Sequence, residues 1–260
     1  NNWEQVRSDL QRTWRCVVNA EDALANVTAE EETWNRSRQD IQELLSSLPR
    51  EDREETQKWR VQCERGMEGL AIPARVNYVG KALGLFDLGY TFHGSHFVIN
   101  RYLRTTWLWD KLRVQGGAYG AFSQLDRFSG IMGFASYRDP QLANTLEVFD
   151  ETARFLKEAE LDDAELNRAV VGAVGDLDRH RLPDAKGMLS LMRYLLGDDL
   201  KTRQRIRDEV LSTSRQDFRD FADWLEMVKD RGEAVVLGDK QALDKAAEQG
   251  LPLQTVWQIL

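Results

Sequence analysis

Apolar residues recur at helical spacing along the first fifty residues and predict two helices. The apolar stripe of the first helix consists of Trp3, Val6, Leu10, Trp14 and Val17. The stripe of the second consists of Trp34, Ile41, Leu44 and Leu48, and Pro49 closes it. Between them lies a strand candidate at residues 23–28, and Thr28 and Glu31 have the T-x-x-E spacing of a capping box. The opening is therefore expected to run helix, strand, helix.

A charge-dense stretch separates this opening from the middle of the chain. Residues 51–70 are rich in acidic and basic side chains and contain two glycines near their end, so we expect a linker or a solvated helix there. A strand candidate follows Pro73. A helix is predicted from about Ser95 to Arg113, where a Gly-Gly pair must interrupt it.

Two strand-like runs after that helix predict a β-hairpin. The runs cover residues 118–124 and 131–137, with a polar turn at 126–130. Asp139 followed by Pro140 has the form of a helix N-cap with proline at the first helical position. The buried stripe of that helix is expected to be Leu142, Leu146, Phe149, Ala153 and Leu156.

The last third of the chain is predicted to be mainly helical. Asp162 and Glu165 have capping-box spacing for a helix that runs to about residue 178, and further helices follow Pro183. Another helix begins at Ser214, and its apolar stripe is Phe218, Phe221, Leu225 and Val228.

The end of the chain repeats the order of its opening. The helix from Ser214 is followed by a short apolar strand at 234–237, an acidic cap at Asp239 and a helix over 240–249. Recurrence of helix, strand, helix indicates either two related domains, the first represented only by its tail, or a chance repeat in a two-layer fold.

Charge is distributed unevenly along the 260 residues, whose formal net charge is -8. Residues 1–70 carry 10 basic and 15 acidic groups, whereas residues 71–140 carry 8 and 4. The basic middle block also holds 9 of the 18 glycines and 13 of the 24 aromatic residues, which fits a lined cleft or the sheet-bearing part of the core. The acidic total argues against nonspecific binding to nucleic acid or to anionic membranes.

The chain shows no targeting or membrane-spanning segment. No apolar run approaches the roughly 18 to 20 residues that a bilayer span needs, and the first residues lack the features of a signal peptide. We therefore expect a soluble protein, and the missing initiator methionine indicates a fragment of a longer polypeptide. Cys16 and Cys63 are far apart and belong to no C-x-x-C motif, so reduced thiols are expected.

Common catalytic signatures are absent from the sequence. The three histidines, His93, His96 and His180, belong to no H-E-x-x-H or H-x-x-E-H motif, and no nucleophile elbow or phosphate-binding glycine loop occurs. His93 and His96 lie three positions apart and could share one helical face, but two ligands do not make a metal site. Capping or packing is the expected role of both, and catalysis by this chain alone is not expected.

The most distinctive stretch runs from Leu108 to Gly120. In it a helix ends at Arg113, a Gly-Gly pair turns the chain, and Tyr119 enters a strand. A guanidinium and a phenol at one edge of the fold can donate hydrogen bonds to peptide carbonyls or to a developing oxyanion. The spacing alone favours the structural alternative, in which Arg113 complements a helix C-terminus and Tyr119 is a half-buried strand aromatic.

Several stretches of the middle block together resemble one known family. They are Val76-Asn-Tyr-Val-Gly-Lys-Ala, Leu88-Gly-Tyr, His93-Gly-Ser, Arg101-Tyr-Leu-Arg, Leu108-Trp-Asp-Lys-Leu-Arg-Val-Gln-Gly-Gly-Ala-Tyr-Gly and Ser136-Tyr-Arg-Asp-Pro. In these stretches the chain resembles the C-terminal domain of presequence proteases, a branch of the pitrilysin/insulysin superfamily that degrades targeting peptides and other unstructured oligopeptides. The resemblance is dense over residues 71–200 and follows the order of elements elsewhere.

The resemblance implies a fold and a domain organisation. It implies an α+β fold, a two-layer sandwich of a mostly antiparallel sheet with helices on one face. Residues 1–50 would be the tail of a preceding homologous domain, 51–70 a linker, and 71–260 the C-terminal peptidase-like domain. In this family zinc is bound by H-x-x-E-H and a distal glutamate in the N-terminal half. No zinc ligand transfers to this chain, whose partner would be that N-terminal catalytic half of the same protein.

The resemblance also implies roles for four residues of the Gly-Gly turn. Arg113 and Tyr119 would contact the backbone of a peptide substrate across a chamber and help to stabilise the tetrahedral intermediate formed by zinc-activated water. Gly116 and Gly117 would shape the turn that presents them. The alternative is a catalytically inactive scaffold or binding subunit that pairs with a separate zinc-bearing partner. A bacterial cytoplasm is the expected compartment, with an organelle matrix as the alternative.

Overall fold

The computed structural model of the chain describes residues 2–21, 23–50, 66–251 and 253–258. The chain divides into two compact units. The first consists of Asn1–Cys63 and His180–Gly197, and the second of Glu64–Arg179 and Asp198–Leu260. This division differs from the predicted domain of residues 71–260, because His180–Gly197 groups with the opening of the chain. Most of the predicted linker, together with Cys63, lies outside the described residues.

Three helices lie within the described residues of the first unit. They are α1 (Trp3–Val17), α2 (Glu31–Ser47) and α6 (Pro183–Leu195). Both helices predicted for the opening are confirmed, but the strand predicted at residues 23–28 is not formed. A strand needs a hydrogen-bonded neighbour, and residues 23–28 have none among the described residues. The predicted capping box is also wrong, because α2 begins after Glu30 and has no side-chain cap.

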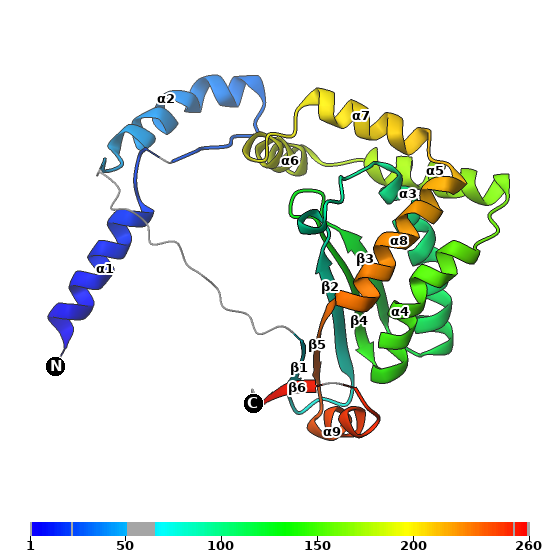
Figure 1. Cartoon of the computed structure of the whole chain (residues 1–260). Coiled ribbons are helices and arrows are strands. Elements are labelled where there is room, and N and C mark those ends of the chain that lie inside the picture. The colour runs from blue at the N-terminus through cyan, green and yellow to red at the C-terminus, as the bar shows by residue number, and fades with distance from the viewer. Residues whose placement is uncertain (1, 22, 51–65, 252, 259–260) are drawn as a thin grey trace. The chain divides into compact units, whose positions relative to one another are not determined.

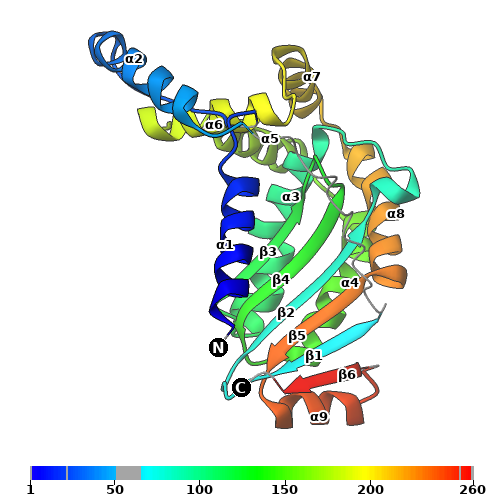
Figure 2. The same ribbon diagram turned by 90° about the vertical axis from the view of Figure 1, so that its left-hand side faces the viewer.

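The second unit is built on a six-stranded sheet with the order β3-β4-β2-β5-β1-β6. The strands are β1 (Met67–Ala71), β2 (Asn77–Gly84), β3 (Gly120–Leu125), β4 (Ile131–Asp139), β5 (Glu233–Gly238) and β6 (Leu253–Gln258). Figure 2 shows the strands side by side in this order. Strand β2 is antiparallel to β4 and β5, and β3 is antiparallel to β4, whereas β1 is parallel to β5 and β6. The sheet is therefore mixed, with antiparallel pairs in the majority.

Helices cover one face of this sheet (Figure 1). The helices of the second unit are α3 (Ser95–Thr105), α4 (Leu142–Glu158), α5 (Asp163–Leu177), α7 (Leu200–Leu211), α8 (Arg215–Arg231) and α9 (Lys240–Glu248). Helices α3, α4 and α8 lie against the sheet, α5 and α7 pack on α3, and α9 contacts β1 and β5. Two short segments, η1 (Phe86–Leu88) and η2 (Trp109–Gln115), link strands and helices. The expected two-layer α+β fold is confirmed.

The core lies between the sheet and these helices. Every residue of the two predicted stripes in α4 and α8 is buried, so each large aliphatic or aromatic side chain contributes about 1.5 to 3 kcal/mol. The capping box predicted at Asp162 is confirmed, since Asp162 accepts from the Glu165 amide and Glu165 accepts from the Asp162 amide. At the predicted start of α8, the Ser214 amide and hydroxyl both donate to the Asp217 carboxylate. The predicted hairpin corresponds to β3 and β4.

Two predicted boundaries differ from the structure. Residues 67–70, placed in the linker, belong to β1, which is paired on both sides by β5 and β6. The long helix predicted from Ser95 stops at Thr105, where Thr106 leaves the helical conformation with φ -119° and ψ -88°; the Thr105 and Thr106 hydroxyls donate to carbonyls of the preceding turn. After this break the chain forms η2, a π-helical segment.

The predicted N-cap at Asp139 is displaced. Asp139 is the last residue of β4, and α4 begins at Leu142 after Gln141. The Asp139 carboxylate still supports the start of the helix, because it accepts from the Gln141 amide at 2.8 Å and from the Thr145 hydroxyl at 2.5 Å. Pairing of Asp139 with Asn77 in the sheet explains why the helix starts later.

A buried lysine crosses the interface between the two layers. Lys81 of β2 is 8% exposed, and its ammonium lies 2.5 Å from an Asp150 carboxylate oxygen on α4. The same ammonium donates to the Lys229 carbonyl of α8 at 2.8 Å. One charge thus links a strand to both helices above it.

No helix within the described residues combines the length and apolar character needed to cross a membrane.

Candidate functional site

The Gly-Gly turn after η2 has the geometry that both glycines require. A Cβ on Gly116 would lie 2.7 Å from the Leu112 carbonyl oxygen, and Gly117 has φ +77°, in the left-handed region. The Gly117 amide donates to the Arg113 carbonyl at 3.2 Å, and the Ala118 amide donates to the Leu112 carbonyl at 2.8 Å. These bonds end the π-helical segment, a conformation that is frequent at functional sites, and turn the chain directly into β3.

Arg113 lies on the helical side of this turn. Its guanidinium stacks over the ring of Trp109 at 4.1 Å from the centroid, a cation–π contact. In the described part of the chain, the guanidinium has no carboxylate partner and makes no hydrogen bond. Its donors therefore remain available to a ligand.

Tyr119 lies on the strand side of the turn and is 68% exposed. Its ring packs edge-on against Tyr137 at 5.9 Å, and Tyr137 packs in the same way against Tyr78 at 5.3 Å. These three residues are called the tyrosine cluster below. The Tyr119 phenol makes no hydrogen bond to any described residue, and none joins it to the Arg113 side chain. The structure thus places Arg113 and Tyr119 on opposite sides of one tight turn. Within the described residues, neither the guanidinium nor the phenol has a hydrogen-bond partner.

A β-bulge brings another side chain to the tyrosine cluster. Asn77 pairs with Asp139, but Val79 pairs with Ser136, so two residues of β4, Tyr137 and Arg138, lie opposite one residue of β2. Such a bulge turns both side chains outward instead of alternating them, and both are exposed. Arg138 belongs to none of the site residues predicted from the sequence. No local signal could have revealed the bulge, because it arises from pairing with a distant strand.

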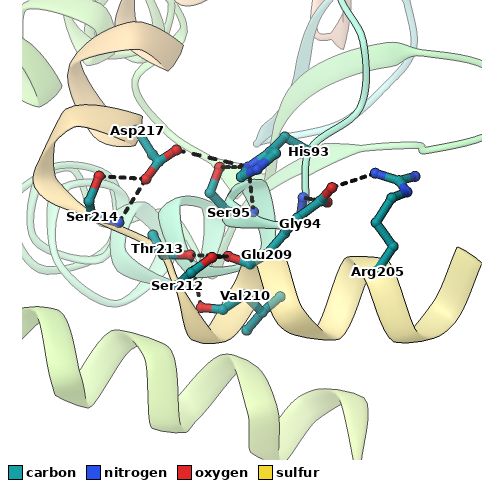
Figure 3. Close-up of polar contacts among 10 residues, drawn as sticks. All are labelled: His93, Gly94, Ser95, Arg205, Glu209, Val210, Ser212, Thr213, Ser214 and Asp217. Atoms are coloured by element: carbon teal, nitrogen blue, oxygen red, sulfur yellow. Dashed lines mark hydrogen bonds and ion pairs between the residues drawn. The ribbon is translucent and has the colours of Figure 1, made fainter.

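His93, Ser95 and Asp217 meet at the start of α3, but they do not form a catalytic triad (Figure 3). Ser95 Oγ lies 2.8 Å and Asp217 Oδ1 lies 3.9 Å from the same imidazole nitrogen, His93 Nδ1. A proton relay needs the two partners on different ring nitrogens, and Ser95 is buried.

The surroundings of His93 show a structural role instead. His93 Nδ1 accepts from the Ser95 amide at 3.3 Å, as a cap of α3. The adjacent Gly94 amide donates to Glu209 of α7 at 2.7 Å, and Asp217 caps α8 through the Ser214 amide and hydroxyl, both at 2.7 Å. Figure 3 shows these bonds joining the beginnings of α3 and α8 to the end of α7. His93 precedes the N-cap residue of α3, Gly94, which has no side-chain cap, and its ring bonds the first residue of the helix.

His96 is a packing residue, as predicted. It is 1% exposed and lies edge-on to Phe221 at a centroid distance of 4.9 Å, and neither ring nitrogen has a hydrogen-bond partner in the described structure. Burial lowers the pKa of His96 to about 3, so the folded protein holds it neutral. His96 lies in an aromatic core, whereas His93 forms a hydrogen bond with Ser95, so the two imidazoles have different surroundings. Among the described residues, no group of three or more His, Cys, Asp or Glu side chains is placed to hold a metal ion.

Acid should destabilise the fold through His96. An unfolded imidazole has a pKa of about 6.5, so below that pH the unfolded state binds a proton that the folded state excludes. Stability therefore falls between pH 6.5 and 3, by up to about 1.4 kcal/mol per pH unit. When the pH falls from 7 to 5, the free energy of unfolding of the wild type should decrease by about 2 kcal/mol more than that of His96→Leu. Urea unfolding at both pH values measures this difference. The exposed residue His180 supplies the control, and equal losses for His96→Leu and His180→Gln would contradict this account.

Comparison with known protein sequences gives consistent matches. Residues 67–239 match a family model described as the PreP C-terminal domain. Presequence protease 1, chloroplastic/mitochondrial, of Arabidopsis thaliana is 39% identical over 245 residues, 94% of this chain and 23% of that protein. Protein HypA of Clostridium perfringens is 25% identical over 238 residues, 92% of this chain and 24% of that protein. The chain spans about a quarter of the length of these relatives.

Solved structures share the fold at low sequence identity. The crystal structure of pitrilysin matches with a TM-score of 0.54 and 15% identity, over 88% of this chain and 25% of that chain. A peptidase M16 inactive domain from Pseudomonas fluorescens matches with a TM-score of 0.55 and 16% identity, over 78% of this chain and 51% of that chain. At such identities the likeness shows the fold alone, that of a pitrilysin-type peptidase domain.

Proposed function

Because the chain belongs to the PreP C-terminal domain family, we propose that it is the non-zinc-binding C-terminal portion of a zinc metalloendopeptidase. The longer enzyme degrades unstructured oligopeptides such as targeting peptides, and this portion forms part of the wall of its chamber. The observation that carries the proposal is the pair of free donors, the Arg113 guanidinium and the Tyr119 phenol, on either side of a turn that only glycines can form.

Arg113 and Tyr119 contact the peptide backbone in this proposal. A guanidinium and a phenol supply hydrogen-bond donors without needing an acceptor, so they suit a peptide carbonyl, and they suit better the negative charge that develops on its oxygen during hydrolysis. Strand β3, which begins directly after Tyr119, is the outermost strand of the sheet. An extended substrate could therefore add to that edge, and its selection would depend on backbone more than on sequence.

Zinc is held by the upstream half in this proposal. The residues described in this chain do not suit it, and no role given to Arg113 or Tyr119 depends on a metal bound here.

The names of the relatives indicate, in broad terms, the compartment in which the longer enzyme works. The plant relative is called chloroplastic/mitochondrial and another is bacterial, which supports an organelle matrix or a bacterial cytoplasm.

The opening of the chain supports an upstream partner. All five apolar residues of the α1 stripe are exposed, from 44% at Val6 to 77% at Val17. The corresponding stripe of α8 is buried against the second unit's own sheet. An uncovered stripe of this size indicates a missing layer. We assign residues 1–50 to the tail of a preceding homologous domain, whose sheet would cover α1.

The chain alone and the longer polypeptide should behave differently. Purified alone, the 260-residue chain should hold no stoichiometric zinc and cleave no unstructured peptide, whereas the longer polypeptide should do both. The α1 amides should also exchange more slowly in the longer polypeptide, because its upstream domain covers the stripe. Metal analysis, a fluorogenic peptide assay and hydrogen exchange measure these outcomes.

Each part of this proposal can fail separately. Stoichiometric zinc together with peptidase activity in the chain alone would contradict the assignment as a non-zinc portion. Equal exchange of α1 in both proteins would contradict the assignment of residues 1–50. An upstream sequence without H-x-x-E-H would favour the alternative, an inactive scaffold or binding subunit that pairs with a separate zinc-bearing partner.

A further inference from the structure

We propose that Arg138 is a further substrate-contact residue, which binds a carboxylate of the peptide beside Tyr119. The carboxylate belongs either to an acidic side chain or to the free C-terminus of the substrate. This inference rests on the proposed function and adds a charge preference to it. Three independent features of Arg138 support it: its backbone conformation, its unpaired guanidinium and its position.

The backbone of Arg138 is strained. Its φ of +50° is the only positive φ of a non-glycine residue in the described part of the chain. This left-handed conformation costs an L-residue free energy, whereas glycine adopts it readily. Arginine is therefore a poor choice for the bulge on conformational grounds. Strain of this kind is common where a side chain serves binding or catalysis.

The residue after the bulge holds the strained conformation in place. Asp139 is 0% exposed, and its carboxylate is bonded to the Gln141 amide and the Thr145 hydroxyl. Its carbonyl accepts from the Asn77 side chain at 3.0 Å. Because β4 is anchored on this side of the bulge, the backbone of Arg138 is held in its left-handed conformation.

The guanidinium of Arg138 is available to a ligand. It lies over the ring of Tyr137 at 5.6 Å from the centroid, and no carboxylate or hydrogen-bond acceptor of the described chain pairs with it. Stacking on an aromatic ring leaves the edge of the guanidinium free. That edge matches a carboxylate, with which it can form two parallel hydrogen bonds.

The position of Arg138 places it beside the proposed substrate site. The Tyr119 amide donates to the Tyr137 carbonyl at 3.1 Å and to the Arg138 carbonyl at 3.4 Å. Arg138 therefore lies directly across the strand pair from Tyr119. A peptide that contacts the Tyr119 phenol and follows the edge of β3 would pass close to this second guanidinium.

Peptide binding to the longer polypeptide tests the charge preference. The probes are one labelled peptide with a free C-terminus and a single glutamate, its C-terminal amide, its Glu→Gln form, and the form with both changes. Binding is measured by fluorescence anisotropy, with cleavage blocked by a chelator. Arg138→Gln should weaken binding of the carboxylate-bearing peptide by about 10-fold, the scale of a charged hydrogen bond, and leave the doubly neutral peptide unchanged. The singly changed peptides show which carboxylate Arg138 binds.

A second variant separates binding from folding. Arg138→Gly should lose the same preference, yet raise the Tm of the 260-residue chain by about 2 °C because the strain is relieved. Equal affinity for charged and neutral peptides in the wild type, or an unchanged preference in Arg138→Gln, would overturn the inference. The proposed function would survive that result if Arg113→Ala and Tyr119→Phe still lowered turnover.

Discussion

Replacing Arg113 by alanine in the longer polypeptide should lower peptide turnover by about 10-fold to 1000-fold, the range for loss of one oxyanion donor. Tyr119→Phe should have an effect of the same order, since it removes only the phenolic hydroxyl from an exposed ring. Neither change disturbs the core. Each variant should therefore unfold within about 1 kcal/mol of the wild type. Turnover on an unstructured peptide, measured together with Tm, checks both expectations.

Matched controls come from residues of the same type away from the turn. Arg104 on α3 is exposed, and no carboxylate of the described chain pairs with it. Tyr194 on α6 is 73% exposed. Arg104→Ala and Tyr194→Phe should leave turnover unchanged. If all four variants retained wild-type turnover, Arg113 would only complement the end of η2 and Tyr119 would be a surface aromatic.

Replacing Asp150 by alanine should lower the free energy of unfolding by about 3 kcal/mol, because it leaves the Lys81 ammonium buried without its counter-ion. The Lys229 carbonyl would be its only remaining partner in the described structure. Lys81→Met in the same background should recover most of that loss, since an apolar side chain of similar length has no charge to desolvate. Urea unfolding of the single and double variants measures the coupling.

An exposed ion pair supplies the control for this effect. Arg101 and Asp176 lie 2.7 Å apart, with side chains 37% and 64% exposed. Asp176→Ala should cost less than about 1 kcal/mol. If Asp150→Ala lowered the free energy of unfolding as little as Asp176→Ala, Lys81 would be hydrated in solution and would not link the two layers.

The elements that were predicted correctly are those with local signals. The helices that begin at Asp163 and Arg215 have capping boxes and regular apolar stripes, so their sequences alone determine their starts and their buried faces. Strand β1 was missed because its five residues follow a charge-dense segment, and its stability comes from β5 and β6 on either side. The opposite error occurred at residues 23–28, where a strand-like pattern finds no pairing neighbour among the residues that the structure describes.

The parts of the candidate site that could be predicted from the sequence are likewise those with local signals. Arg113, the glycine pair and Tyr119 follow one another in the chain, so a motif could single them out, and the geometry of the turn depends on nearby atoms. The π-helical form of η2 and the tyrosine cluster depend on tertiary packing. Arg138 becomes noticeable only once β2 and β4 are paired, because the bulge is a property of their register.

If this chain contacts the peptide as it is hydrolysed, one rate must fall when those contacts are removed. That rate is the turnover, at saturating peptide, of the longer polypeptide carrying both Arg113→Ala and Tyr119→Phe. We expect a fall of at least about 100-fold, with an unchanged Tm. A rate within twofold of the wild type would contradict it.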